Sequence, residues 1–327
     1  AYAIAACLVG SEMCIRDRTG VVALIHGKSH GNRRVGLRAD MDALPIDEIS
    51  GVPFSSQTPG TMHACGHDAH TTMLLGAAKH LAETRDFDGT AVLIFQPAED
   101  GLGGARQMMA DGLFKTFPVD EIYGMHNSPN GKTGTFDICK GVAMAGAMFF
   151  DAHIRGLGSH AAMPHQSRDT VVIASTLVSQ LQTIVSRNVA PLDSCVMSVT
   201  QIHAGAAYNV VPENAHIAGT VRYFREEVCN LAMQRMQAIC DGIAAAYEVE
   251  INLDMRNVFD VLVNDHELSD AYIDAATDIL GAENVSDISV PATGSEDFAD
   301  ILRVVPGAYC RVGHTGTTGL HNPVSYT

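Results

Sequence analysis

The sequence predicts an α/β protein in which a smaller ferredoxin-like β-α-β-β-α-β domain is inserted into a larger α/β domain. Three observations lead to this fold class. The chain has 327 residues, about two domains' worth. Apolar strand-like runs alternate with helical periodicity on both sides of residues 141–256, and inside that segment the order of elements changes. The flanks, residues 19–140 and 257–327, are each too small alone, so we expect them to form one discontinuous domain.

The first flank contains the elements of an open sheet layered by helices. It begins with two strand-like runs separated by a polar turn over residues 28–32. Leu74, Ala78 and Leu81 recur at helical spacing, and the short apolar run TAVLIF is typical of a buried central strand. We expect strands over residues 21–27, 34–44, 90–95 and 121–125, and helices over residues 70–84 and 103–114.

The inserted segment begins with the alternating run MFFDAHIRG, which predicts a strand over residues 148–156. A long helix follows, with Val172, Leu177 and Leu181 on one face. After the insertion, strand and helix signals of the larger domain return. The remaining elements expected are helices over 169–188, 226–247 and 266–280 and strands over 194–203, 216–224, 248–255 and 308–312.

Charge and hydropathy exclude two classes of partner. With 21 Lys and Arg against 37 Asp and Glu, the net charge is −16, which disfavours binding to nucleic acid or anionic lipid. No uninterrupted apolar stretch reaches the length of a transmembrane helix, so we expect no membrane partner. Fifteen histidines are the first indication of metal or proton chemistry.

The two ends of the chain differ from its interior. Residues 1–18 lack an initiator Met and the basic start of a secretion signal. Their run CLVGSEMCIRDR resembles translated adapter sequence, so we expect a foreign leader there and a truncation at the other end. The six cysteines beyond residue 18 are scattered, without zinc-ribbon or CxxC spacing. Apart from Cys65, we expect buried thiols in a reducing, cytoplasmic compartment.

The densest site signal is the run HACGHDAH over residues 63–70. Cys65 and His67 are two residues apart, so they lie on one side of an extended segment. Thiolate, imidazole and carboxylate together are ligands of transition metals. The alternative is a polar loop in which Asp68 or Thr71 caps the following helix. The density of donors favours a metal site.

A second signal follows the predicted central strand, where Glu99 and Asp100 stand in front of a glycine-rich turn. In open α/β sheets, functional groups gather at the carboxyl ends of strands. Two adjacent carboxylates repel unless a cation or a shared proton relieves them. The alternative is a solvated turn. His126 and His321 are single histidines at strand or loop ends. Alone, each is typical of an ordinary surface or core histidine; taken with the first two signals, they complete a plausible ligand set.

Eight motifs in one order carry a resemblance to a known family. They are HACGHDAH, FQPAEDG, GMHNSP, GLGSHAAMPH, NVVPENA, GTVRYF, GSEDFA and LHNP. The chain resembles the metal-dependent amidohydrolases of the hippurate hydrolase, N-acyl-amino-acid amidohydrolase and indoleacetyl-amino-acid hydrolase family, relatives of the dinuclear metal exopeptidases. The resemblance implies the fold of those exopeptidases, with the inserted domain as a lid that also serves for dimerisation.

The resemblance also implies a metal site in the larger domain. Two divalent ions, of manganese, zinc, cobalt or nickel, are expected, with Cys65 bridging them as a thiolate. Glu99 is implied as the general base, and Asp42 supports the site and orients a ligand. The family usually has Glu where Asp100 stands, and Asp reaches about 1.5 Å less. The implied ligands are Cys65, His67, Asp100, His126 and His321.

From the inserted domain, the resemblance implies that His160, Asn209 and Arg222 face the substrate's carbonyl and carboxylate. The implied reaction is hydrolysis of a small-molecule N-acyl amino acid to a carboxylic acid and an amino acid by a water between the ions. Three alternatives stay open: Cys65 as a nucleophile, a metal-binding homologue without turnover, and a peptidase or deacetylase acting on a related small amide.

Overall fold

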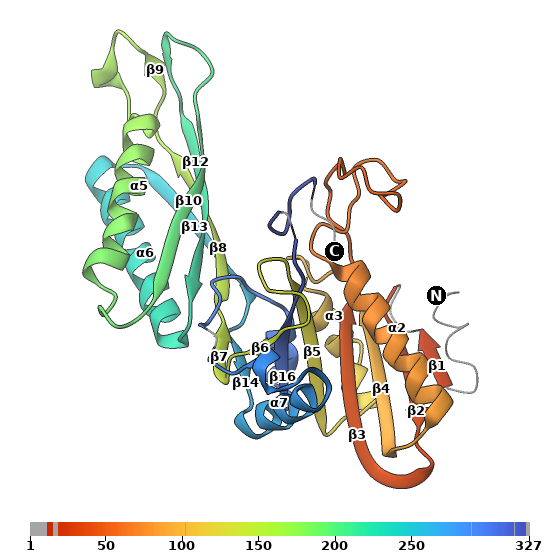
Figure 1. Cartoon of the computed structure of the whole chain (residues 1–327). Coiled ribbons are helices and arrows are strands. Elements are labelled where there is room, and N and C mark those ends of the chain that lie inside the picture. The colour runs from red at the N-terminus through yellow and green to blue at the C-terminus, as the bar shows by residue number, and fades with distance from the viewer. Residues whose placement is uncertain (1–11, 16–18, 102, 289, 317, 325–327) are drawn as a thin grey trace. The chain divides into compact units, whose positions relative to one another are not determined.

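The computed structural model describes residues 12–15, 19–101, 103–288, 290–316 and 318–324 (Figure 1). The chain divides into two compact units. The larger unit comprises Ala1–Ala143, Leu262–Pro291 and Glu296–Thr327, and the smaller unit comprises Met144–Val261 and Ala292–Ser295.

The larger unit is built on a mixed sheet of eight strands in the order β1-β2-β4-β3-β5-β16-β6-β15 (Figure 1). Its apolar core lies between α2 and the strands β2, β3 and β4, and includes Leu74, Ala78, Leu93 and Phe95. The strands are β1 (Glu12–Ile15), β2 (Val21–His26), β3 (Ser29–Asp40), β4 (Asp88–Gln96), β5 (Glu121–Ser128), β6 (Phe136–Ile138), β15 (Val285–Ser286) and β16 (Gly307–Gly313), with the separate pair β7 (Gly141–Met144) and β14 (Leu262–Asn264). The helices are α2 (His67–Thr84), α3 (Gly104–Ala110), α4 (Leu113–Thr116), α7 (His266–Leu280), the 3₁₀ turn η2 (Ala282–Asn284) and α8 (Phe298–Leu302).

The structure corrects three details of the predicted elements. The helix expected over residues 103–114 is two short helices, because Gly112 has φ 93° and interrupts the helical backbone. The turn expected over residues 28–32 is mostly the start of β3, which ends at Asp40 and not at residue 44. Residues 12–15 form β1, which pairs antiparallel with β2, while most of residues 1–18 lies outside the described residues. That they are a foreign leader stays a prediction.

The parallel strands of this sheet direct polar residues to one edge. β3 is parallel to both β4 and β5, so the carboxyl ends of these strands meet. Asp42 follows β3, Glu99 and Asp100 follow β4, and His126 lies near the end of β5. Helix α2 begins beside them with His67. The edge at which open α/β sheets hold their functional groups therefore carries the residues of interest.

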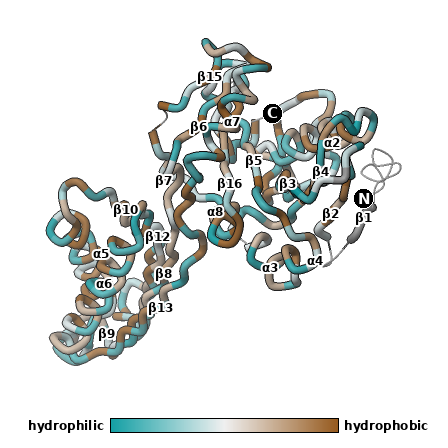
Figure 2. Tube along the Cα trace, turned by 90° about the horizontal axis from the view of Figure 1, so that it is seen from below, coloured by the Kyte–Doolittle hydropathy of each residue, from teal (hydrophilic) through white to brown (hydrophobic). Residues whose placement is uncertain are grey.

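The smaller unit has the β-α-β-β-α-β order expected for residues 141–256. Its antiparallel sheet has the order β10-β12-β8-β13, so β10 and β13 are the edge strands. Along α5 and α6, hydrophobic and hydrophilic residues are interspersed (Figure 2), and the buried residues recur about every three or four positions. This spacing is typical of helices that bury one face. The elements are β8 (Gly146–Arg155), α5 (Thr170–Arg187), β10 (Cys195–Ala204), β12 (Asn214–Tyr223), α6 (Glu226–Tyr247) and β13 (Glu250–Phe259), with β9 (Ser159–His160), the 3₁₀ turn η1 (Pro164–Gln166) and β11 (Val210–Val211) between them.

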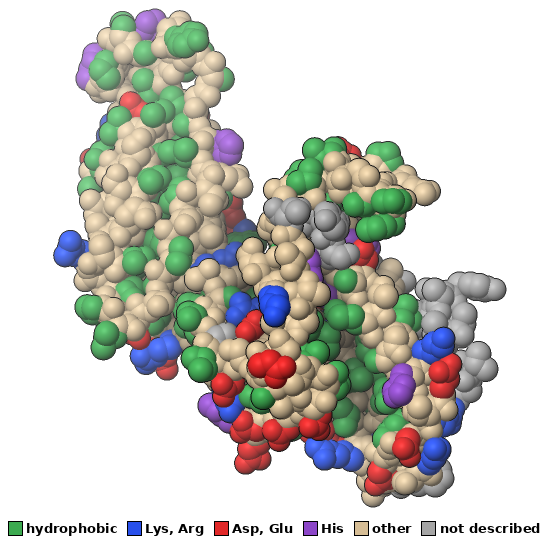
Figure 3. Space-filling model, viewed as in Figure 1, with side chains coloured by type: hydrophobic (Ala, Val, Ile, Leu, Met, Phe, Trp, Pro, Cys, Tyr) green, Lys and Arg blue, Asp and Glu red, His purple; other side chains and the backbone are tan. Residues whose placement is uncertain are grey.

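On the face shown in Figure 3, acidic side chains cluster over α7, which contributes Glu267, Asp270 and Asp274. Among the helices that the structure describes, none is long and apolar enough to cross a membrane.

Candidate metal centre

The structure brings together seven of the ten residues singled out in the sequence, all in the larger unit. They come from segments far apart in the chain: the turn before α2, the ends of β3, β4 and β5, and the segment after β16. These residues are Asp42, Cys65, His67, Glu99, Asp100, His126 and His321.

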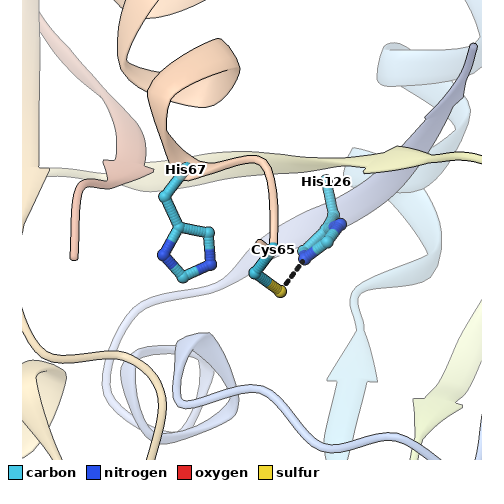
Figure 4. A group of neighbouring side chains, drawn as sticks. All are labelled: Cys65, His67 and His126. Atoms are coloured by element: carbon cyan, nitrogen blue, oxygen red, sulfur yellow. Dashed lines mark hydrogen bonds between the residues drawn. The ribbon is translucent and has the colours of Figure 1, made fainter. Parts of the chain in front are cut away.

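A glycine shapes the turn that presents the first two donors. Gly66 has φ 88°, in the left-handed region, and a Cβ there would lie 2.5 Å from Oδ1 of Asn127. Any other residue would therefore be both strained and obstructed. The turn ends at His67, the first residue of α2, and leaves Cys65 and His67 on the same side of the chain (Figure 4).

Two histidines lie close to the thiol of Cys65. Its Sγ lies 3.5 Å from Nε2 of His126 (Figure 4). The same atom lies 3.2 Å from Nε2 of His321. The other ring nitrogen of His126 donates to the carbonyl oxygen of Asn127 at 2.7 Å, so Nε2 can offer its lone pair. Burial lowers the pKa of His126 to about 4, which keeps the ring neutral, and burial raises the pKa of the Cys65 thiol.

Asp42 positions His67. Nδ1 of His67 lies 3.0 Å from the carbonyl oxygen of Asp42 and 3.2 Å from its Oδ1. Nε2 is therefore the nitrogen that is left to bind a metal ion. Burial by itself lowers the pKa of His67, but the hydrogen bond to Asp42 and the nearby carboxylates raise it to about 9. The imidazole is therefore held in one orientation by the residue expected to orient a ligand.

Asp100 lies close to His321 and to Asp42. Its Oδ1 is 3.6 Å from Nε2 of His321, and its backbone N–H donates to Oδ2 of Asp42 at 3.1 Å. Burial raises the pKa of Asp100. Although Asp is shorter than the Glu usual in the family, a carboxylate oxygen of Asp100 lies within 4.8 Å of donors from Cys65 and His321.

Glu99 is a buried carboxyl group beside these donors. It is 5% exposed, and its Oε2 lies 3.9 Å from Nε2 of His67. Burial raises the pKa of Glu99 well above its ordinary value, and the charges of Glu296 and Asp297 raise it further. A carboxylate with a raised pKa accepts a proton more readily, which suits proton transfer.

The donors fit divalent metal ions. Cys65 belongs to two groups whose donor atoms lie within 4.8 Å of one another, one with His67 and His126 and one with Asp100 and His321. Nε2 of His67 and Oδ2 of Asp100 are buried, and neither has a hydrogen-bond partner among the described residues. Burying such atoms unpaired is costly, so they indicate a missing ligand. Thiolate, imidazole and carboxylate are the donors that transition metals prefer.

A second layer of polar residues lies beneath these donors and was not predicted from the sequence. His70 lies in the HACGHDAH motif but is not among the predicted ligands. The backbone N–H of Asn127 donates to Nε2 of His70 at 2.9 Å, so the ring donates from Nδ1 to Asp40 at 2.6 Å. His70 thereby links β3, α2 and β5 beneath the donors. Only its place in the motif could have indicated this.

Arg38 was also missed. Its side chain is 1% exposed and contacts Asp40 at 2.6 Å, Asp297 at 2.8 Å and Glu296 at 2.9 Å. Three carboxylates around one buried guanidinium compensate a charge that would be very costly alone. The GSEDFA motif contains Glu296 and Asp297, and was the one available signal.

The other three residues lie in the smaller unit, at two ends of its sheet. His160 and Asn209 are neighbours, since the N–H of Ala161 donates to the carbonyl oxygen of Asn209 and β9 pairs with β11. Arg222 lies near the end of β12, where it donates to Oγ of Ser295 at 2.6 Å. Asn214, at the opposite end of β12, is next to the segment that leads to β9 and β11.

Comparison with known proteins identifies the class to which this fold and site belong. The profile described as Peptidase family M20/M25/M40 matches residues 36–327. The chain belongs to this family and is a hydrolase that acts on linear amide bonds. The family resemblance and the α/β fold with a separate antiparallel sheet are thereby confirmed.

Similar proteins show how near the relation is. A hippurate hydrolase of Campylobacter jejuni is 40% identical over 305 residues, covering 93% of this chain and 79% of that protein. An N-acetyl-L-cysteine deacetylase of Bacillus subtilis is 42% identical over 307 residues, covering 94% of this chain and 72% of that protein. A crystal structure of a dinuclear metal-binding peptidase of the M20 family from Bacillus subtilis matches with a TM-score of 0.83 at 32% identity, covering 99% of this chain and 85% of that one.

Proposed function

We propose that the chain hydrolyses N-acyl amino acids to a carboxylic acid and a free amino acid, with two divalent ions at the candidate metal centre. The observation that carries the proposal is the position of Cys65, which is shared by two groups of metal donors. One thiolate shared by two such groups could bind both members of a pair of neighbouring ions. His67 and His126 would hold one ion, Asp100 and His321 the other, and Cys65 both.

Glu99 and Asp42 have separate roles in the proposed hydrolysis. When bound, two divalent ions lower the pKa of a water and polarise the amide carbonyl. Glu99 takes a proton as the water oxygen attacks the carbonyl carbon, and delivers a proton to the nitrogen as the C–N bond breaks. Its burial and raised pKa support this role. Asp42 keeps His67 and Asp100 in place through its two carboxylate oxygens.

Several observations disfavour Cys65 as a nucleophile. Burial raises the pKa of its thiol, whereas a nucleophilic cysteine needs a lowered pKa. A thiol mechanism also leaves Glu99 and Asp100 without a role. Hydrolysis by an activated water uses both carboxyl groups, Glu99 as the base and Asp100 as a metal ligand.

Arg222 supports a substrate with a free carboxylate. It is half-buried, and in the described part of the chain no carboxylate lies within ion-pair distance of it. Burial lowers its pKa, but a guanidinium stays charged near neutral pH. A planar guanidinium binds a carboxylate through two hydrogen bonds. The substrates in the names of the two relatives, hippurate and N-acetyl-L-cysteine, are both N-acyl α-amino acids with such a group.

The positions of Arg222 and His160 near opposite ends of β12 favour a dimer. Arg222 and Asn214 are eight residues apart along the strand, about 26 Å at ~3.3 Å per residue. His160 and Asn209 lie beyond the Asn214 end, so one smaller unit cannot place Arg222 and His160 on one small substrate. If both act, they belong to two chains. The edge strand β10, with exposed Ile202, offers a surface for such pairing.

The test is a substrate panel on protein loaded with manganese or zinc. We expect turnover of hippurate and N-acetyl-L-cysteine and a loss of roughly 10²–10⁴-fold in kcat for Glu99→Gln, with its metal content unchanged. Metal analysis of both proteins separates loss of the base from loss of the ions. Full metal content with no turnover of any N-acyl amino acid would contradict the proposal, and a normal rate for Glu99→Gln would contradict the role of Glu99.

A further inference from the structure

A row of histidines lies on three adjacent strands of the four-stranded sheet of the smaller unit. His203 on β10 is the direct partner of His216 on β12, which is the direct partner of His153 on β8. Side chains alternate between the two faces of a strand, and the neighbours of His153, Ala152 and Ile154, are buried. The three rings therefore lie on the face opposite the buried one, and His153 and His203 are exposed.

Two of these rings lie beside a carboxylate. The rings of His153 and His216 are stacked, with centroids 4.6 Å apart and an interplanar angle of 15°. Nε2 of His216 lies 2.7 Å from Oδ1 of Asp151, which precedes His153 by two residues and shares its face. One donor atom from each of the three lies within 4.8 Å of the others. An open hollow of about 450 Å³ borders both histidines.

We propose that Asp151, His153 and His216 form a binding site for a divalent transition-metal ion such as zinc, nickel or copper. Imidazole and carboxylate are the donors that these ions accept, and three protein ligands leave a fourth position for water. All three donors belong to the smaller unit, whereas Cys65 and its partners belong to the larger unit. The site is therefore additional to the metal centre at which we place the hydrolysis.

The geometry needs little adjustment to hold an ion. Zinc–nitrogen distances of about 2.0–2.1 Å put the donor atoms of a tetrahedral site roughly 3.3 Å apart. Nε2 of His216 and Oδ1 of Asp151 lie 2.7 Å apart, so they must separate slightly as an ion enters, while His153 moves toward them. Its side chain is exposed and free to rotate toward the other two.

Arg256 holds the carboxylate in place. It forms ion pairs with the second oxygen of Asp151 and with Asp254, so Oδ1 of Asp151 stays directed at His216. An ion between Oδ1 and Nε2 takes the place of the proton that these atoms share. The neutral ring of His216 then carries its one proton on Nδ1 and offers the lone pair of Nε2 to the ion. Arg256 thus acts as the outer partner that fixes a ligand.

The first test reads the histidines one by one in the full-length protein. Carbethoxylation with diethyl pyrocarbonate, mapped by mass spectrometry, is measured as zinc is added. We expect zinc to protect His153 and His216. His80, an exposed histidine on α2, is the internal control and should stay reactive. Protection of His80 equal to that of His153 would show unspecific binding and overturn the proposal.

The second test removes one ligand. Loss of a side chain that supports a metal ligand weakens metal affinity by roughly 10–100-fold, and loss of a ligand itself costs at least as much. His153→Ala should therefore weaken zinc binding by at least about tenfold. In equilibrium dialysis this appears as one zinc ion fewer per chain than in the wild type. His203→Ala is the matched control, because its ring is in the same row but 6.0 Å from that of His216, and outside the donor group. Equal zinc contents in the wild type and His153→Ala, or equal losses in the two variants, would refute the site.

Discussion

Replacing Asp42 should loosen both proposed ions, although Asp42 itself is not among the proposed ligands. Its Oδ1 lies 3.2 Å from Nδ1 of His67, and its Oδ2 accepts the backbone N–H of Asp100 at 3.1 Å. In Asp42→Ala, His67 keeps only its contact with the backbone carbonyl at 3.0 Å, and the N–H of Asp100 loses its partner. Each proposed ion thus has one ligand, His67 or Asp100, that is held less firmly.

The magnitude follows from these two contacts. An outer partner of a metal ligand is worth roughly 10–100-fold in affinity, about 1.4–2.7 kcal/mol per ion. Asp42→Asn keeps one carbonyl oxygen as an acceptor, but its NH₂ group cannot accept the second hydrogen bond. We therefore expect the order of affinity to be wild type, then Asp42→Asn, then Asp42→Ala.

Competition with a chromophoric chelator measures this affinity, and elemental analysis gives the ions retained per chain. Asp47→Ala is the matched control: Asp47 is exposed, lies on the same segment, and accepts a backbone N–H from Gly60 at 2.6 Å. It removes a similar hydrogen bond without touching a proposed ligand. If Asp42→Ala holds its ions as tightly as Asp47→Ala, the positioning role of Asp42 is wrong.

Two further predictions concern the thiolate and the substrate carboxylate. Cobalt-loaded protein should show a thiolate-to-metal charge-transfer absorption that Cys65→Ser loses and Cys139→Ser keeps; a band that survives in Cys65→Ser would exclude Cys65 as a ligand. Arg222→Ala should lower kcat/KM strongly for an N-acyl amino acid and little for the matching amide without a carboxylate, a difference of ~1.5–3 kcal/mol for a charged hydrogen bond. Equal losses on both substrates would mean that Arg222 does not bind the carboxylate.

The sequence predicted the proposed donors because their signals are local or lie in recognisable motifs. Cys65 and His67 are two residues apart, and Glu99 and Asp100 directly follow a continuous apolar strand. His126 and His321 carried little information alone and entered through their motifs. The structure adds what these signals lacked: the distances that join segments up to 256 residues apart, as between His321 and Cys65.

The residues that the sequence did not predict are those whose role depends on burial. Arg38 and Asp40 look like an ordinary charged pair in a strand, and only the folded structure buries both and places Glu296 and Asp297 against Arg38. A pattern of alternation cannot show that a strand is covered on both faces. The break at Gly112 has a related cause, because a glycine within a helical pattern does not reveal whether the backbone turns there.

Charge balance connects this buried layer to the metal centre. Arg38 and the imidazole of His67 are the main cations near a larger number of acidic groups, and burial together with mutual repulsion raises the pKa of Glu99 and that of Asp297. Two divalent cations would supply four positive charges, which would lower the pKa of Glu99 and keep it ionised, so that it can act as a base. The acidic groups near the metal centre and Arg38 are Asp40, Asp42, Glu99, Asp100, Glu296 and Asp297.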